Sequence, residues 1–426
     1  MRKLSLDFII KRLANLQFAI GLLFTIGLVI ALGTLIEQEQ SLSFYQQNYP
    51  QTKPTFGFIT WSLISVLQLD NIYTSYWFIT LLIVFSVSLL ACTLTVQLPS
   101  LRRFRRWKFF TNLINSNGIE KKLSTNTNNA ANYTLHYSNY HTFRQGKKNY
   151  AYSGLLGRVG PIIVHASIIL LLLGSSIGAF GGYLAQELIP RGEIFHVQNL
   201  VKSGNFGHVP QAITWRVNDF WITYTKELKT KQFYSDLSLL DTNGNELKRK
   251  TIFVNEPFVY KYLTLYQTDW DLVSFKLRVN SSQVVQVPLQ KSFKSGRKFW
   301  FGSFEMNKEK FSFLVNDLRG NLLLYDGKGL FIKECFIGKP IELNSDVQFE
   351  VSELTTSTGL QIKTDPGIRV VYFSFFLLIC SVYASFISYS QIWGVEKDNY
   401  ILFSGNSNRA VLFFQTEFKK MLGRIE

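Results

Sequence analysis

The sequence predicts an integral membrane protein with four transmembrane α-helices and a large, mostly antiparallel β domain between the third and fourth helices. Hydrophobic residues make up 47% of the 426 residues and charged residues only 17%. Four apolar runs approach the roughly 20 residues that cross a hydrocarbon core. Between the last two runs, polar and apolar residues alternate over many short stretches, which is typical of strands. These observations define the fold class.

The predicted transmembrane helices are the four long apolar runs. The first is too long for a secretory signal peptide and no small-residue cleavage site follows it, so we expect it to stay in the protein. The segment 55–70 is apolar but too short to cross, and we expect a helix in the membrane interface there. The four predicted spans are residues 16–36, 76–98, 159–180 and 370–389.

The net charge of +16 is concentrated on alternate segments of the chain. Residues 1–15, 99–158 and 390–426 together hold twenty basic residues against six acidic ones. Basic residues near span ends stay on the cytoplasmic side, so we expect these three segments in the cytoplasm or stroma. Residues 37–75 and 181–369 then lie on the opposite side. Topology accounts for the charge, and no nucleic-acid partner is expected.

Two parts of the 99–158 segment stand out by composition. The run from Arg102 to Lys108 mixes arginines with aromatic residues, as in a segment that lies on lipid headgroups. The Asn-rich residues 125–133 read as a flexible connector.

The segment 181–369 is long enough to form its own core. Asn243-Gly244 lies between two alternating runs and predicts a hairpin, so a β-sandwich or open barrel is expected. The three cysteines, Cys92, Cys335 and Cys380, are far apart and form no CxxC motif. The chain is therefore neither a dithiol oxidoreductase nor itself a c-type cytochrome.

The four predicted spans contain no Asp, Glu, Lys, Arg or His residue besides His165. It lies about six residues into the third span, or about 9 Å deep at 1.5 Å per residue. Gly174, Gly178 and Gly182 follow at a spacing of four and predict a face for close helix packing. Gly174 is nine residues from His165, about half a turn around the helix, so the imidazole is expected to face away from the glycines.

Three interpretations of His165 remain open on the residues alone. The imidazole can form a hydrogen bond to a neighbouring helix, take part in a proton relay, or bind haem iron as an axial ligand. A relay is disfavoured because no further ionisable group lies at membrane depth. A haem held by two histidines of this chain is excluded for the same reason, so a second ligand must come from another subunit or copy.

Five segments resemble, in chain order, the ResB family, the Ccs-type proteins of the system II pathway of cytochrome c maturation. The resemblance covers nearly the whole chain, and its one mild departure is Tyr262-Leu263 where the family has a glycine. The segments are GTLIEQ (33–38), LDNIYTSYWFITLL (69–82), GRVGPIIVHASIILLLLGSSIGAFGG (157–182), VNEPFVYKYLTLYQTDW (254–270) and SQIWGVEKDNYILFSGNSNRA (390–410).

The resemblance implies a subunit of a cytochrome c synthase complex that carries haem across the membrane to an apocytochrome c. It implies that His165 is an axial ligand of a transient haem b, with the second ligand on a tryptophan-rich, haem-handling Ccs-type membrane partner. This chain has no tryptophan cluster and looks like the unfused ResB-like half, which is not an enzyme on its own. Within the segment 254–270, Tyr266, Gln267 and Trp270 are weak candidates for docking a partner or substrate. A role in the β core is favoured for this segment.

Two other functions are kept as alternatives. One is an electron-transfer subunit with a permanent b-haem, and the other is a haem-free scaffold or sensor with a β ectodomain.

The abundance of Phe, Asn and Lys is typical of AT-rich genomes and favours a plastid-encoded protein. We therefore expect a thylakoid membrane with the β domain in the lumen, the alternative being a bacterial inner or thylakoid membrane.

Overall fold

The computed structural model describes most of the chain. The described residues are 2–55, 57–104, 107, 109–110, 119–124, 127–210, 213–227, 229–279, 283–294, 297–306, 309–344, 347–397 and 399–425.

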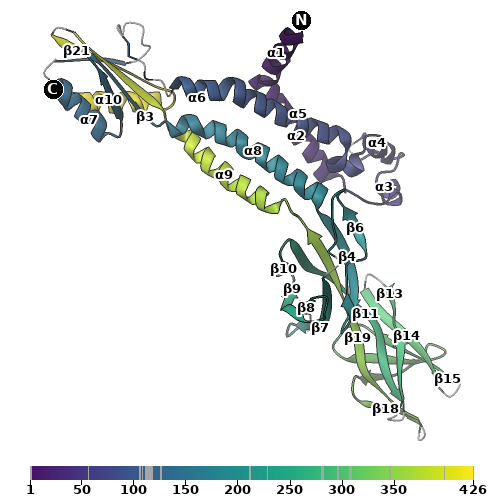
Figure 1. Ribbon diagram of the computed structural model, residues 1–426. Helices are drawn as coiled ribbons and strands as arrows, with labels where there is room; N and C mark the ends of the chain where they lie inside the picture. Colours follow the sequence, from purple (N-terminus) through teal and green to yellow (C-terminus); the bar gives the residue numbers. More distant parts are fainter. Residues whose placement is uncertain are drawn as a thin grey trace. The chain divides into compact units, whose positions relative to one another are not determined.

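Four helices of the described residues are long and apolar enough to cross a membrane (Figure 1). This confirms the predicted fold class. The second helix is longer than the predicted span, because it continues through a π-helical turn to Phe104. The helices are α2 (Leu16–Leu35), α5 (Tyr76–Cys92) with η2 (Thr93–Gln97) and α6 (Leu98–Phe104), α8 (Leu156–Gly181) and α9 (Ile368–Phe386), preceded by the short α1 (Arg2–Leu13).

The π-helical turn η2 has a local cause in the sequence. Pro99 has no N–H group, so it cannot bond to the carbonyl four residues earlier. The Leu98 N–H instead bonds to the Thr93 carbonyl, five residues back. Such turns widen a helix at one point and are frequent at functional sites.

The helices α8 and α9 run antiparallel and lie side by side, with glycines between them (Figure 1). A Cβ atom on Gly157 would lie 1.9 Å from the carbonyl oxygen of Ile387, and one on Gly174 would lie 3.1 Å from Val370. On the opposite side, Ile168 and Leu172 of α8 pack against the core formed by α2 and α5.

Three short helices lie between α2 and α5. The segment 55–70, predicted as one interfacial helix, contains α4 and the start of η1. Thr55 pairs with Ile59 in an isolated bridge, and Gln68 adopts a left-handed conformation, so the helix is interrupted on both sides. The short helices are α3 (Leu42–Asn48), α4 (Trp61–Val66) and the 3-10 helix η1 (Leu69–Thr74).

Glu37 and Gln38 hold this loop together at the end of α2. The Tyr49 hydroxyl donates to Glu37 Oε2 at 2.5 Å, and this bond lowers the pKa of the Glu37 carboxyl. Gln38 Nε2 donates to the Leu69 carbonyl at 3.0 Å, and Gln38 Oε1 accepts from the Ile72 N–H at 3.1 Å. Gln38 thereby ties the loop across more than thirty residues, and Glu37 ties it across twelve.

The large β domain lies in the chain between α8 and α9 and is antiparallel throughout its described pairings, as predicted. It contains three sheets, and the first sheet shares one buried core with the second and another with the third. The first has the order β10-β11-β19-β4-β6, with β12 on β11 and β18 on β19; the second is β13-β14-β15-β16-β17; the third is β5-β7-β8-β9. Asn243-Gly244 forms the predicted hairpin turn between β8 and β9, with Gly244 at a φ of 83°.

The strands of the large β domain have the following bounds. The first sheet contains β4 (Tyr183–Pro190), β6 (Leu200–Ser203), β10 (Phe258–Tyr260), β11 (Leu263–Val279), β12 (Gln283–Pro288), β18 (Pro340–Asn344) and β19 (Val347–Thr364). The second contains β13 (Gln290–Lys294), β14 (Arg297–Met306), β15 (Glu309–Val315), β16 (Asn321–Asp326) and β17 (Phe331–Phe336). The third contains β5 (Ile194–Phe195), β7 (Thr214–Tyr224), β8 (Thr230–Leu240) and β9 (Glu246–Phe253).

A second folded domain is built from two segments that lie far apart in the sequence, 119–153 and 390–423. We call it the split domain: β1 (Ile119–Ser124), α7 (Asn128–Tyr137), β2 (His141–Gln145) and β3 (Lys148–Ser153) precede α8, while β20 (Ser390–Glu396), β21 (Tyr400–Ser407) and α10 (Val411–Gly423) follow α9. Its sheet has the order β1-β21-β20-β3-β2. Ile401 and Phe403 of β21 share a buried core with Leu135 of α7 and Phe418 of α10.

The prediction of a flexible connector over 125–133 is wrong for its described part. Residues 128–137 form α7, because Ala131 and Leu135 lie one turn apart and bury the same helix face. Asn128 is buried as well and accepts a hydrogen bond from Asn149 at 2.7 Å. Residues 125 and 126 lie outside the described residues, as do Arg105, Arg106 and Lys108 of the basic run.

Gly157→Ala tests the contact between α8 and α9. The added methyl group would overlap the Ile387 carbonyl, so we expect a loss of about 2 kcal/mol in stability, within the range for overpacked sites. Thermal unfolding in detergent, followed by size-exclusion chromatography, measures the effect. Gly27→Ala in α2 is the control, because nothing lies within 4 Å of its Cβ position. Equal melting temperatures for the two variants would contradict the packing.

Tyr49→Phe tests the acid stability of the loop after α2. A carboxyl whose pKa is lowered in the folded state stabilises it above the unfolded pKa, and this contribution is lost as the pH falls through the folded pKa. Without the Tyr49 hydroxyl, the Glu37 pKa rises and the loop opens at a higher pH than in the wild type. Hydrogen exchange of residues 37–75 against pH measures the shift. In a Glu37→Gln background, Tyr49→Phe is expected to cause no such shift.

Candidate functional site

His165 lies half-buried on α8 and faces the π-helical turn η2. Its Nδ1 is 3.0 Å from the Thr93 hydroxyl, and its Nε2 is 3.1 Å from Nε2 of Gln97. Both ring nitrogens therefore have partners on the second membrane helix, 68 and 72 residues earlier in the chain. The seam between α8 and the helix that runs from α5 to α6 is the candidate site.

The hydrogen bonds around His165 select one neutral tautomer. The Thr93 hydroxyl donates its single hydrogen to the Leu89 carbonyl at 2.8 Å, so towards His165 it acts as an acceptor. In this arrangement Nδ1–H donates to Thr93, and Nε2 keeps its lone pair, which accepts from the Gln97 amide. A lone pair on Nε2, with Nδ1–H held by a partner, is the form in which histidine binds metals.

Gln97 is a loosely satisfied partner for His165. Its Oε1 is buried and has no hydrogen-bond partner among the described residues. An orphaned buried acceptor costs about 1–3 kcal/mol, so the contact can give way to a better ligand for Nε2. The donor set thus fits an axial ligand of haem iron.

The predicted division of α8 into two faces is confirmed at Gly174. Gly178 lies against Asp365 and Gly182 against the Thr364 carbonyl, both before α9 begins, so these two glycines do not pack a helix as predicted. Gly174 is in contact range of Val370 and Val371 of α9, whereas His165 contacts Thr93 and Gln97 on the other membrane helix. The prediction did not identify Thr93 or Gln97. The signal available in the sequence was Pro99, which marks a break in the helix, but the rotation that brings these two side chains to His165 is not visible there.

The three weak docking candidates of β11 do not form one surface. Tyr266 is exposed, whereas Gln267 is buried and its Oε1 accepts from the Ser235 hydroxyl at 2.8 Å. Trp270 stacks in the domain interior, with its ring centroid 5.1 Å from that of Trp300 and 6.2 Å from that of Phe220. A bulge between Gln267 and Asp269 interrupts the alternation of the strand.

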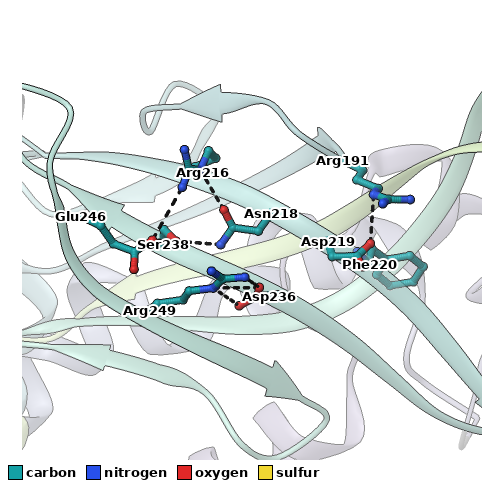
Figure 2. Close-up of polar contacts among 9 residues, drawn as sticks. All are labelled: Arg191, Arg216, Asn218, Asp219, Phe220, Asp236, Ser238, Glu246 and Arg249. Atoms are coloured by element: carbon teal, nitrogen blue, oxygen red, sulfur yellow. Dashed lines mark hydrogen bonds and ion pairs between the residues drawn. The ribbon is translucent and has the colours of Figure 1, made fainter.

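The polar side chains of the third sheet are paired with one another (Figure 2). Arg216 donates to Asn218 at 2.8 Å, and Asn218 donates to Ser238 at 2.7 Å. Arg249 forms a bidentate pair with Asp236 across β8 and β9. Such cross-strand pairs stabilise sheets. Among the described residues, no group of three or more His, Cys, Asp or Glu side chains could hold a metal ion.

Comparison with known proteins gives consistent relatives over the whole chain. The ResB-like family matches residues 16–328. The cytochrome c biogenesis protein Ccs1 of Emiliania huxleyi is 54% identical over 423 residues, which are 98% of this chain and 96% of that protein. Ccs1 of Porphyra purpurea is 43% identical over 425 residues, 98% and 96% of the two chains. The cytochrome c biogenesis protein CcsB of Thermosynechococcus vestitus is 41% identical over 415 residues, 95% and 93%.

Thr93→Val tests the tautomer of His165. The variant removes the acceptor for Nδ1–H, so we expect the Nε2–H form to gain population at the expense of the Nδ1–H form. Nitrogen NMR of ¹⁵N-histidine-labelled protein, assigned with His165→Ala, reports both forms. Thr95→Val is the matched control, because that hydroxyl bonds only to the Ala91 carbonyl. A wild-type spectrum with the proton on Nε2 would contradict the network.

Proposed function

Because this chain belongs to the ResB-like family, we propose that it handles haem during the assembly of c-type cytochromes, with His165 Nε2 as an axial ligand. A role in c-type cytochrome biogenesis agrees with the names of relatives at 54% and 43% identity. The single observation that carries the finer proposal is the hydrogen-bond network that leaves the Nε2 lone pair of His165 facing Gln97.

Binding of iron at Nε2 requires one local change in the seam. The Gln97 amide must leave the lone pair, while Thr93 continues to hold Nδ1–H and thereby orients the ring. Hydrogen bonds of this kind to the second nitrogen fix the tautomer and raise the basicity of a ligating imidazole. Thr93 is therefore a positioning residue and Gln97 an exchangeable one.

The second axial ligand belongs to another protein in this proposal. The predicted spans of the chain contain no histidine besides His165, and no tryptophan cluster is present in the sequence. A tryptophan-rich, haem-handling membrane partner would supply the second ligand and the outer haem pocket. The chain is then an accessory subunit, and the thioether bonds form between haem and the cysteine thiols of the apocytochrome at the partner's site.

We place the protein in a thylakoid membrane, with the split domain in the stroma and the large β domain in the lumen. The excess of basic residues in 1–15, 99–158 and 390–426 supports this orientation. In the lumen the large β domain would dock the apocytochrome or the partner. Tyr266 is the docking candidate that is exposed enough to touch a protein, while Gln267 and Trp270 would act by shaping β11.

His165→Ala tests the proposal in cells that make c-type cytochromes. We expect holocytochrome c to fall below about one tenth of the wild-type level, because the haem loses an axial ligand in the membrane, and we expect added imidazole to restore part of it. Haem staining of membrane proteins measures both. His141→Ala, at an exposed histidine of the split domain, is the matched control and should leave the level unchanged.

Two outcomes would contradict the proposal. Normal holocytochrome c in the His165→Ala strain would favour a haem-free scaffold. Stoichiometric haem that stays on the purified chain through cytochrome assembly would favour a resident b-haem and electron transfer.

A further inference from the structure

Two layers of side chains occupy the seam between α8 and the helix from α5 to α6. Gln97 faces His165 in one layer, and Phe104 faces Arg158 in the other. Residues 97 and 104 are seven apart, as are 158 and 165, so each pair lies on one face of its helix, two turns apart. The two layers are therefore about 10.5 Å apart along the helix axis.

Arg158 in the second layer is held by aromatic rings. Its guanidinium carbon lies 4.0 Å from the ring centroid of Phe104 and 5.3 Å from that of Tyr389. No carboxylate forms an ion pair with Arg158 in the described part of the chain. Its Nε is buried and has no hydrogen-bond partner among the same residues.

This arrangement leaves a positive charge and a buried donor uncompensated. Stacking on rings occupies the flat faces of a guanidinium, while the N–H groups at its edge remain available for bidentate binding of an anion. A cavity of about 190 Å³ is lined by Phe104 together with Ser100, Arg103 and Gln391. Arg103 brings a second cation that forms no ion pair among the described residues. The end of the seam therefore has the chemistry of a carboxylate site.

We propose that Arg158 binds a propionate carboxylate of the haem that His165 ligates, and so fixes the rotation of the haem in the seam. The inference rests on the proposed function and adds the anchor for the anionic edge of the macrocycle. The distance between iron and carboxylate in a haem is of the same order as two turns of helix, so both contacts can be made from one helix face. A lipid headgroup at the membrane surface is the competing source of an anion for the same arginine.

Porphyrin binding to the purified full-length chain in nanodiscs tests the proposal. Ferric haem and its dimethyl ester, in which both carboxylates are blocked, are titrated and the Soret band is followed. For Arg158→Gln we expect at least tenfold weaker binding of haem and less than a twofold change for the ester, because hydrogen bonds to charged groups contribute at this level. Arg158→Lys, which keeps the charge but not the fork, should show an intermediate loss.

Control variants separate the possible failures. Arg102→Gln removes an equal charge from an exposed position of α6 and should leave both affinities unchanged. Equal weakening of haem and ester by Arg158→Gln would overturn the inference in favour of a structural or lipid-binding arginine. If His165→Ala abolishes binding while Arg158→Gln has no effect, the inference fails and the proposed function stands. If His165→Ala has no effect on the binding of either porphyrin, both fail.

Discussion

The need to satisfy both nitrogens of an imidazole at membrane depth is the constraint on which the site depends. Water is scarce there, and an unpaired polar group costs about 1–3 kcal/mol. The protein meets this cost with Thr93 and Gln97 from a neighbouring helix, which fixes the helix register, the ring orientation and the tautomer together. The contacts that stabilise His165 without a ligand thus also prepare it to bind iron. In the proposed haem-bound state, only the Gln97 contact would have to change.

The glycines of α8 explain how one helix can serve two purposes. One side of α8 packs closely against the segment that contains α9, because three glycines on it carry no side chain: Gly157, Gly160 and Gly174. Close packing alone holds that side in place. The other side is then free to carry His165 and Arg158 against the helix from α5 to α6. Because Gly174 is about half a turn around the helix from His165, close packing at that glycine does not restrict which polar group stands opposite.

The local features of this fold could be predicted from the sequence, and the non-local ones could not. The four membrane helices follow from apolar runs, and the antiparallel domain follows from alternation and from turns such as Asn243-Gly244. The split domain escaped prediction because β1 and β3 find β21 and β20 more than 200 residues later. His165 was identifiable as the odd residue in an apolar run, but its partners Thr93 and Gln97 depend on a π-helical turn whose rotation no sequence pattern encodes. Gln267 and Trp270 match a family signature, yet the burial of Gln267 and the ring contacts of the half-buried Trp270 depend on a bulge in β11.

The order of strands in the split domain also constrains biosynthesis. The last two strands to be translated, β20 and β21, take the central places in the sheet, between β3 and β1. During translation β2 and β3 can pair with each other, but β1 and the other edge of β3 have no neighbour until all four membrane helices have been made. Closure of this sheet is therefore the final event of assembly, and a polypeptide truncated before Ser390 carries unpaired strand edges that expose it to quality-control proteases.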